Sequence, residues 1–154
     1  MKTEAVENFW KEFCEMNSGL NIETPFQIWF FGSSSEMARE LAELVIAGEK
    51  TATASLVAVN EITPEIAPID EGYSVVTDFE GNPQCVIQTT EIRLMPFIEV
   101  DAQFAFDEGE GDQTLEFWRD VHWRYFTKEA AQLNLEFNEK SLVCCERFQL
   151  LFPK

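Results

Sequence analysis

The stretch Ser33-Ser-Ser-Glu-Met-Ala-Arg-Glu-Leu-Ala-Glu-Leu-Val-Ile-Ala-Gly48, followed directly by Glu49-Lys-Thr-Ala-Thr-Ala-Ser55, decides the fold of this chain. Ser33 and Glu36 have the spacing of a helix-capping box. Apolar residues then recur on one helical face, and Gly48 stands where glycine commonly ends a helix. The pattern predicts a helix over 34–47 that leads into a strand over 51–59.

Segments on either side of this unit give the fold class. Helical spacing of apolar residues predicts a helix over 3–16, a short helix over 101–107 and a helix over 114–126 that extends through 128–133. Strands are predicted over 25–31, 73–79, 84–93 and 142–151, with a hairpin turn at 80–83 and a loop over 60–71. This order favours an α+β fold with a mainly antiparallel sheet or small β-barrel, decorated by helices. No repeat or linker divides the 154 residues, so we expect a single domain over 1–154.

Charge and composition limit the classes of partner. Eleven Lys and Arg against 28 Asp and Glu give a net charge of −17. Basic residues bind phosphate groups by neutralising their charge, so the composition disfavours binding to duplex DNA, long RNA and anionic membranes. A small or weakly charged ligand is the expected partner.

Cysteine and histidine usage favours a cytoplasmic protein without cofactors. No apolar run is long enough to span a membrane, and residues 1–10 lack the apolar core of a signal peptide. The four cysteines have no CxxC spacing and are expected to be reduced, buried thiols. With one histidine and no ligand pairs at metal spacing, we expect no metal site and no cofactor.

Three groups of residues could carry chemistry. Lys50 precedes the hydroxyls of Thr51, Thr53 and Ser55, which share one strand face. A lysine beside a hydroxyl acts as its general base if burial lowers the lysine pKa. The alternative is a solvated lysine before a threonine-rich strand.

The second group is the acidic run over 107–112, and the third is His122. The acidic run either caps the next helix, brings a catalytic carboxylate toward a cation, or binds a metal. His122 shares a helix face with Trp118 and Phe126, which favours a hydrogen-bonded core residue over a catalytic one.

The combination of motifs resembles the ASCH domain family, and in particular its larger bacterial subgroup, with an extra helix at about 3–16. The resemblance runs from about residue 28 to 151. It rests on Glu40-Leu-x-x-Leu-Val-x-x-Gly48-x-Lys50-Thr51-Ala-Thr53, Gly81-x-Pro83-x-Cys85-Val86-Ile87, Pro96-Phe97, Phe104-Ala105-x-x-Glu108-Gly109-Glu110-Gly111-Asp112 and Trp118-Arg119-x-x-His122-x-x-Tyr125-Phe126.

The resemblance implies a PUA-like β-barrel decorated by helices and a role in RNA metabolism. A small relative is an amidohydrolase that removes the acetyl group from N4-acetylcytidine with a Lys, a Thr and a Glu. Its Gly-x-Lys-x-x-Thr motif matches Lys50 and Thr53, and its Glu best matches Glu110. Where that relative has an Arg two residues after the Thr, this chain has Ser55.

The residues and the resemblance together predict a nucleoside- or nucleotide-binding protein, with amide hydrolysis of an N4-acylated cytidine-type nucleoside as the leading activity. Lys50, Thr53 and Glu110 are the predicted catalytic residues. The predicted substrate-binding residues are Thr51, Ser55, Glu108, Asp112 and Arg119. The alternatives are a non-catalytic RNA-binding module, which would need several of Arg39, Lys50, Arg93, Arg119 and Arg124 on one face, and a ribonuclease.

Overall fold

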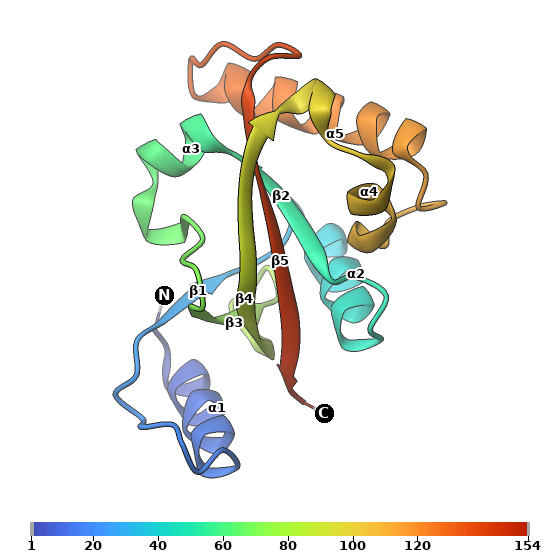
Figure 1. The fold of residues 1–154 in the computed structure, drawn as a ribbon. Coiled ribbons are helices and arrows are strands. Elements are labelled where there is room, and N and C mark those ends of the chain that lie inside the picture. Colours follow the sequence, from blue (N-terminus) through green and yellow to red (C-terminus); the bar gives the residue numbers. More distant parts are fainter. Residues whose placement is uncertain (1, 154) are drawn as a thin grey trace.

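The computed structural model describes residues 2–153 (Figure 1). The helices are α1 (Glu4–Glu15), α2 (Ser35–Ile46), α3 (Val57–Ile62), α4 (Ala102–Glu108) and α5 (Leu115–Gln132). The strands are β1 (Phe26–Trp29), β2 (Ala52–Leu56), β3 (Tyr73–Thr77), β4 (Pro83–Pro96) and β5 (Leu142–Phe152). Short 3-10 turns occupy η1 (Pro64–Ile66) and η2 (Phe97–Glu99).

The strands form one five-stranded sheet of order β1-β3-β4-β5-β2. Only the β1–β3 pair is parallel, and the other three pairs are antiparallel. The predicted α+β class with a mainly antiparallel sheet is confirmed. The edge strands β1 and β2 do not pair with each other, so the sheet does not close into a hydrogen-bonded barrel.

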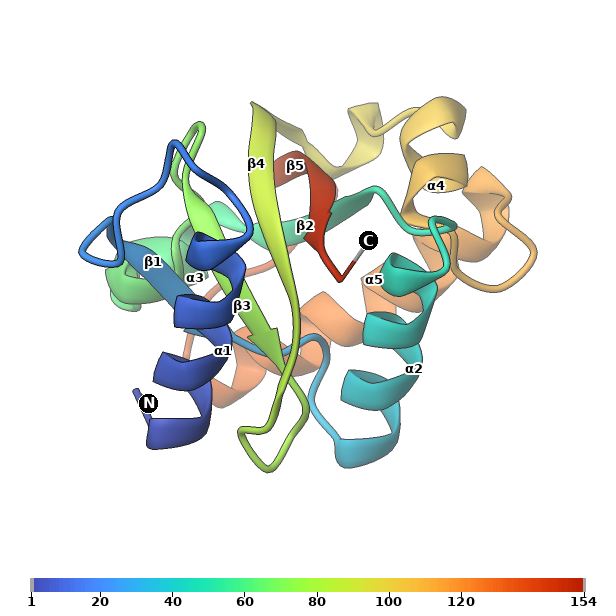
Figure 2. The ribbon, with the colours of Figure 1, turned by 90° about the horizontal axis from the view of Figure 1, so that it is seen from below.

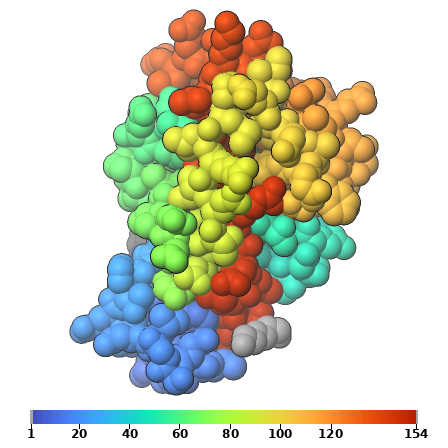
Figure 3. All heavy atoms as spheres, in the orientation of Figure 1, coloured from blue at the N-terminus to red at the C-terminus, as the bar shows by residue number. Residues whose placement is uncertain are grey.

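Helices α1 and α2 lie on opposite faces of the sheet. Side chains of successive strand residues point to opposite faces. Accordingly, Val75 and Val86 pack with α1, whereas Val76 and Ile87 pack with α2. Figure 2 shows the two helices on either side of β3 and β4. The N-terminal helix thus shares a core with the sheet, and in Figure 3 its blue segment forms one end of the molecule.

A further core joins the other end of the sheet to α4 and α5. Trp118 and Phe126 of α5 pack with Ala52 of β2, Val143 of β5 and Phe104 of α4. This packing holds the loop between α4 and α5 against the turn that precedes β2. Thr51 reinforces the contact, because its backbone N–H donates a 2.8 Å hydrogen bond to the Asp107 carbonyl.

Two local predictions are wrong. The residue that caps α2 is Ser34 and not Ser33, because Ser34 has extended dihedral angles and its side chain accepts a hydrogen bond from the Met37 N–H. Strand β2 ends at Leu56, and residues 57–62 form α3. One helical turn places Val59 in the same core as Leu56, so tertiary packing overrides the strand propensity of the β-branched residues.

Candidate functional site

The site is built around a sharp turn between α2 and β2. Gly48 has φ +81°, its N–H bonds to the Val45 carbonyl, and the N–H of Glu49 bonds to the Leu44 carbonyl. This pair of bonds is a Schellman motif, which needs the left-handed conformation that glycine adopts without strain. Because β2 begins only at Ala52, Lys50 lies on the turn, where strand alternation does not fix its direction. Its side chain points inward and is 1% exposed.

Two carboxylates hold the Lys50 ammonium: Glu108 is the last residue of α4, and Glu110 lies in the loop that follows. Its Nζ lies 2.8 Å from Glu108 Oε1 and 2.9 Å from Glu110 Oε2. Between them, Gly109 has φ +73°, and a Cβ there would lie 2.3 Å from the Glu49 carbonyl oxygen. Only glycine lets this loop approach the Lys50 turn so closely.

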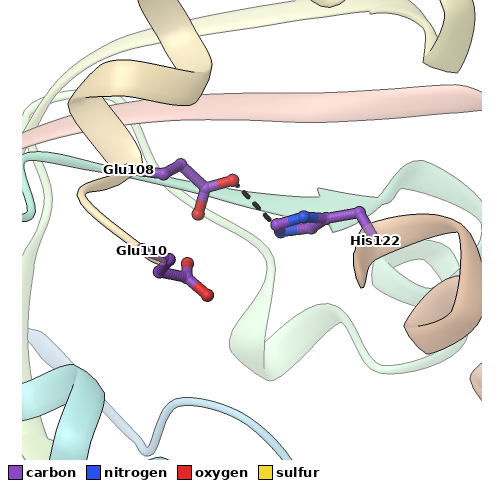
Figure 4. A group of neighbouring side chains, drawn as sticks. All are labelled: Glu108, Glu110 and His122. Atoms are coloured by element: carbon purple, nitrogen blue, oxygen red, sulfur yellow. Dashed lines mark ion pairs between the residues drawn. The ribbon is translucent and has the colours of Figure 1, made fainter. Parts of the chain in front are cut away.

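His122 and Trp118 complete the cluster from α5. His122 Nε2 lies 3.2 Å from Glu108 Oε2, to which the Trp118 indole N–H also donates. His122 Nδ1 lies 2.9 Å from the Trp118 carbonyl. A carboxylate and a carbonyl only accept hydrogen bonds, so these partners favour the imidazolium form of His122, in which both ring nitrogens carry hydrogens. Figure 4 shows Glu108 and His122 pointing toward each other, with Glu110 beside them.

In their charged forms, the four side chains of the cluster balance two cations, Lys50 and His122, against two anions, Glu108 and Glu110. Burial opposes the charge of Lys50, but Glu108 and Glu110 together raise its pKa above the ordinary lysine value. The nearby Lys50 and His122 lower the pKa of Glu108 despite its complete burial. Desolvation raises the pKa of Glu110 above the ordinary value, although Lys50 opposes the rise. Glu108 is thus a fixed anion, and Glu110 is the carboxylate closest to gaining a proton.

Two adjoining cavities share part of their lining, including Thr53. The larger, about 550 Å³, is lined mainly by apolar and aromatic side chains. The smaller, about 80 Å³, is lined by the charged cluster. Thr53 and Tyr125 line both. The structure therefore brings Lys50, Thr53 and Glu110 around one cleft, although 60 positions separate Lys50 from Glu110.

The predicted substrate-binding residues divide between this cleft and other places. Ser55 lines the larger cavity and accepts a 3.0 Å hydrogen bond from Asn60, and Glu108 lies buried in the cluster. Thr51 and Asp112 line neither cavity, and Asp112 instead accepts hydrogen bonds from Thr114, the residue that caps α5. Arg119 lines a separate shallow cavity beside η2.

Glu108, Glu110 and His122 also have the donor atoms of a metal site. One ligand atom from each lies within 4.8 Å of the others. However, the Lys50 ammonium already contacts both carboxylates, and the raised pKa of His122 favours the imidazolium form, which has no lone pair for a metal. The arrangement fits an internal cation better than a bound metal.

Comparison with known proteins identifies the family. The model of the ASCH domain matches residues 27–151. The chain belongs to the ASCH domain family. The ASCH domain has a PUA-like fold, which is associated with RNA binding.

Solved structures agree with this assignment. The crystal structure of an ASCH domain from Lactobacillus crispatus JV V101 is 30% identical, with a TM-score of 0.82 over 98% of this chain and 99% of that one. A protein from Enterococcus faecalis V583 is 34% identical, with a TM-score of 0.85 over 96% and 88% of the two chains. A hypothetical protein of 17% identity and TM-score 0.53, aligned over 81% and 97%, shares the fold alone. No curated protein matches the chain.

Sequence reasoning placed His122 in the core of this ASCH domain and did not connect it with the acidic loop. His122 is indeed buried and hydrogen-bonded, but its partner Glu108 makes it part of the charged cluster. The apolar neighbours of His122 along the helix gave no signal of this, because the carboxylate comes from another element. The buried Glu146 that lines the larger cavity was also missed, since strand β5 reads as an apolar core strand.

No helix within residues 2–153 is long and apolar enough to cross a membrane.

Proposed function

We propose that this ASCH domain binds a free nucleoside in the larger cavity and hydrolyses an acyl amide on its base, with N4-acylated cytidine as the substrate class. The position of Thr53 carries the proposal, because this residue lines both the aromatic-lined cavity and the small cavity that contains the Lys50–Glu110 pair. A cavity of about 550 Å³ falls in the size range of small-molecule sites. Phe30 and Phe79, which are 39% and 46% exposed, line it and suit contact with a base.

The charge distribution supports a nucleoside over an RNA strand. Of the basic residues that an RNA-binding face would need, Lys50 is buried between two carboxylates. Arg93 and Arg124 contact Glu91 and Asp120, respectively. These ion pairs reduce the positive charge available to phosphates. An uncharged nucleoside avoids the repulsion that a polyanion meets at a net charge of −17.

The roles of the three residues follow from the protonation state of Lys50. A protonated lysine has no lone pair, so it accepts the Thr53 proton only as it passes one of its own to Glu110. The raised pKa of Glu110 suits that acceptor role. The Thr53 Oγ then attacks the amide carbonyl carbon, and the C–N bond breaks as the base amine takes the proton back through Lys50. Water then hydrolyses the acyl ester on the Thr53 hydroxyl by the same relay, which releases the carboxylic acid and restores Thr53.

A substrate comparison tests the class of ligand. We expect release of cytidine from N4-acetylcytidine, and no cleavage of a short single-stranded RNA under the same conditions. Glu110→Gln should abolish the release, because the amide cannot take the proton from Lys50, while Glu43→Gln on the exposed face of α2 should retain it. RNA cleavage, or binding to RNA without nucleoside turnover, would contradict the proposal and favour the RNA alternatives.

A further inference from the structure

Glu146 is a buried carboxyl group that the proposed relay does not use. It lies on β5, is 5% exposed and lines the larger cavity. Its Oε2 accepts a 2.6 Å hydrogen bond from the buried Thr89 hydroxyl. Its Oε1 has no hydrogen-bond partner within residues 2–153. In that range, every side-chain oxygen that is fully buried does have a hydrogen-bond partner, so Oε1 is not fully buried. Oε1 therefore reaches accessible space in the cavity.

The register of the sheet puts this carboxyl group beside the proposed nucleophile. Thr53 and Glu146 are directly paired across β2 and β5, and paired residues point to the same face with Cβ atoms about 4.5–5.5 Å apart. In an N4-acylated cytosine, the acyl carbon and the ring nitrogen N3 are both bonded to atoms of the same C4–N4 unit. A base whose acyl carbon faces Thr53 thus brings its ring nitrogen within reach of Glu146.

We propose that Glu146 is a specificity-determining residue of this site, whose Oε1–H donates a hydrogen bond to the unprotonated ring nitrogen of a cytosine-type base. This inference rests on the proposed function and deepens it by assigning the group that recognises the base through a hydrogen bond. Thr89 donates to Oε2, which leaves the carboxyl proton on Oε1. Uracil carries a hydrogen on the corresponding ring nitrogen, so this nitrogen cannot accept a hydrogen bond from Glu146. The site can therefore discriminate cytosine-type bases from uracil.

The surroundings of Glu146 shift its titration toward the neutral form. Desolvation raises its pKa above the ordinary glutamate value, and the Thr89 hydrogen bond and the nearby Lys50 charge only partly oppose the rise. The Cys144 thiol on the same strand is also affected by the Glu146 charge, and burial raises the pKa of Cys144 to about 11, so it remains an uncharged thiol.

Two substitutions at this position separate the donor role from a merely structural one. Glu146→Gln keeps a hydrogen-bond donor, because Thr89 donates to the amide oxygen and leaves the NH2 group facing the cavity. Glu146→Leu removes the donor. Calorimetric titration with cytidine and with uridine should show that the wild type and Glu146→Gln prefer cytidine. The preference should fall about tenfold in Glu146→Leu, the worth of a hydrogen bond in a desolvated site.

Further arms keep the test decisive. If Glu146→Leu does not fold, Thr89→Val should also weaken the cytidine preference, because it frees the carboxyl group to rotate. Equal preference in the wild type and in folded Glu146→Leu, or no binding of either nucleoside at millimolar concentration, overturns the inference. A cytidine preference that depends on Glu146 without any hydrolysis of N4-acetylcytidine would instead refute the proposed hydrolysis and leave the assignment of Glu146 standing.

Discussion

At the scale of single residues, the central feature is a buried lysine whose ammonium group contacts two carboxylates instead of water. Lys50 is as buried as Glu108, and removing one partner of a buried ion pair leaves an uncompensated charge. The pair therefore contributes to folding as well as to any chemistry. A variant of Lys50 must be checked for folding before its activity is interpreted.

Substitution of Lys50 tests this coupling directly. Lys50→Met should lower the free energy of unfolding by about 3–5 kcal/mol, because Glu108 and Glu110 then repel each other in a buried site. The double variant Lys50→Met/Glu108→Gln should recover part of that loss, because one buried charge has also been removed. Urea denaturation of the three proteins measures both effects. A double variant no more stable than the single one would show that the carboxylates are hydrated.

His122 predicts a pH dependence of stability. Burial lowers its pKa, but the Glu108 charge, the hydrogen bond to Glu108 and the Glu110 charge together raise the pKa above the ordinary value in the folded protein. The stability that it contributes is therefore complete below about pH 6.5, the unfolded value, and is lost as the pH rises through the folded pKa. Melting temperatures should fall from neutral to alkaline pH in the wild type and less steeply in His122→Gln. Parallel profiles for the two proteins would contradict the ion pair with Glu108.

At the scale of elements, the turn after α2 and the loop after α4 each contain a glycine with a left-handed backbone conformation, and the two segments meet where Gly109 lies against Glu49. Gly48 has φ +81° and no atom within 4 Å of the point where a Cβ would lie, whereas Gly109 has φ +73° and faces the Glu49 carbonyl. An alanine at position 48 would introduce backbone strain alone, whereas an alanine at position 109 would introduce backbone strain and a steric clash. Their comparison tests whether the acidic loop is held against the Lys50 turn.

Gly48→Ala should cost about 1–2 kcal/mol, the strain of a left-handed residue. Gly109→Ala should cost clearly more, because its Cβ would lie 2.3 Å from the Glu49 oxygen, and it should also abolish nucleoside turnover by displacing Glu108 and Glu110. Thermal denaturation and turnover of N4-acetylcytidine measure the two effects. Equal costs at the two positions would mean that the loop does not pack on the turn.

The elements themselves were largely predictable because their signals are local. Capping residues and apolar spacing define α1, α2 and α5, and the hairpin of β3 and β4 follows from strand alternation around a turn. The exception is α3, where packing of Val59 outweighs local propensity. The site was predictable only in part, since Lys50 and Glu110 carry a family motif, whereas the partnerships of His122 and Glu146 depend on which strands and helices meet.

At the scale of the whole molecule, the fold brings distant segments to one cleft within a strongly acidic protein. Strand β2 presents Thr53, the α4–α5 loop presents Glu110, and α5 closes the cleft with Tyr125. The sheet also sets Glu146 opposite Thr53. A net charge of −17 and the ion pairs of Lys50 with Glu108 and Glu110 are the reasons for proposing an uncharged ligand with an aromatic ring.

The most direct test of this account measures release of cytidine from N4-acetylcytidine by the wild type, by Thr53→Val and by the control Thr127→Val. Thr127 lies exposed on α5, and its hydroxyl bonds to the Trp123 carbonyl of the same helix. We predict turnover by the wild type and Thr127→Val, and loss of most activity in folded Thr53→Val, because the nucleophile is gone. Undiminished release by Thr53→Val, or no release by the wild type, would contradict the account.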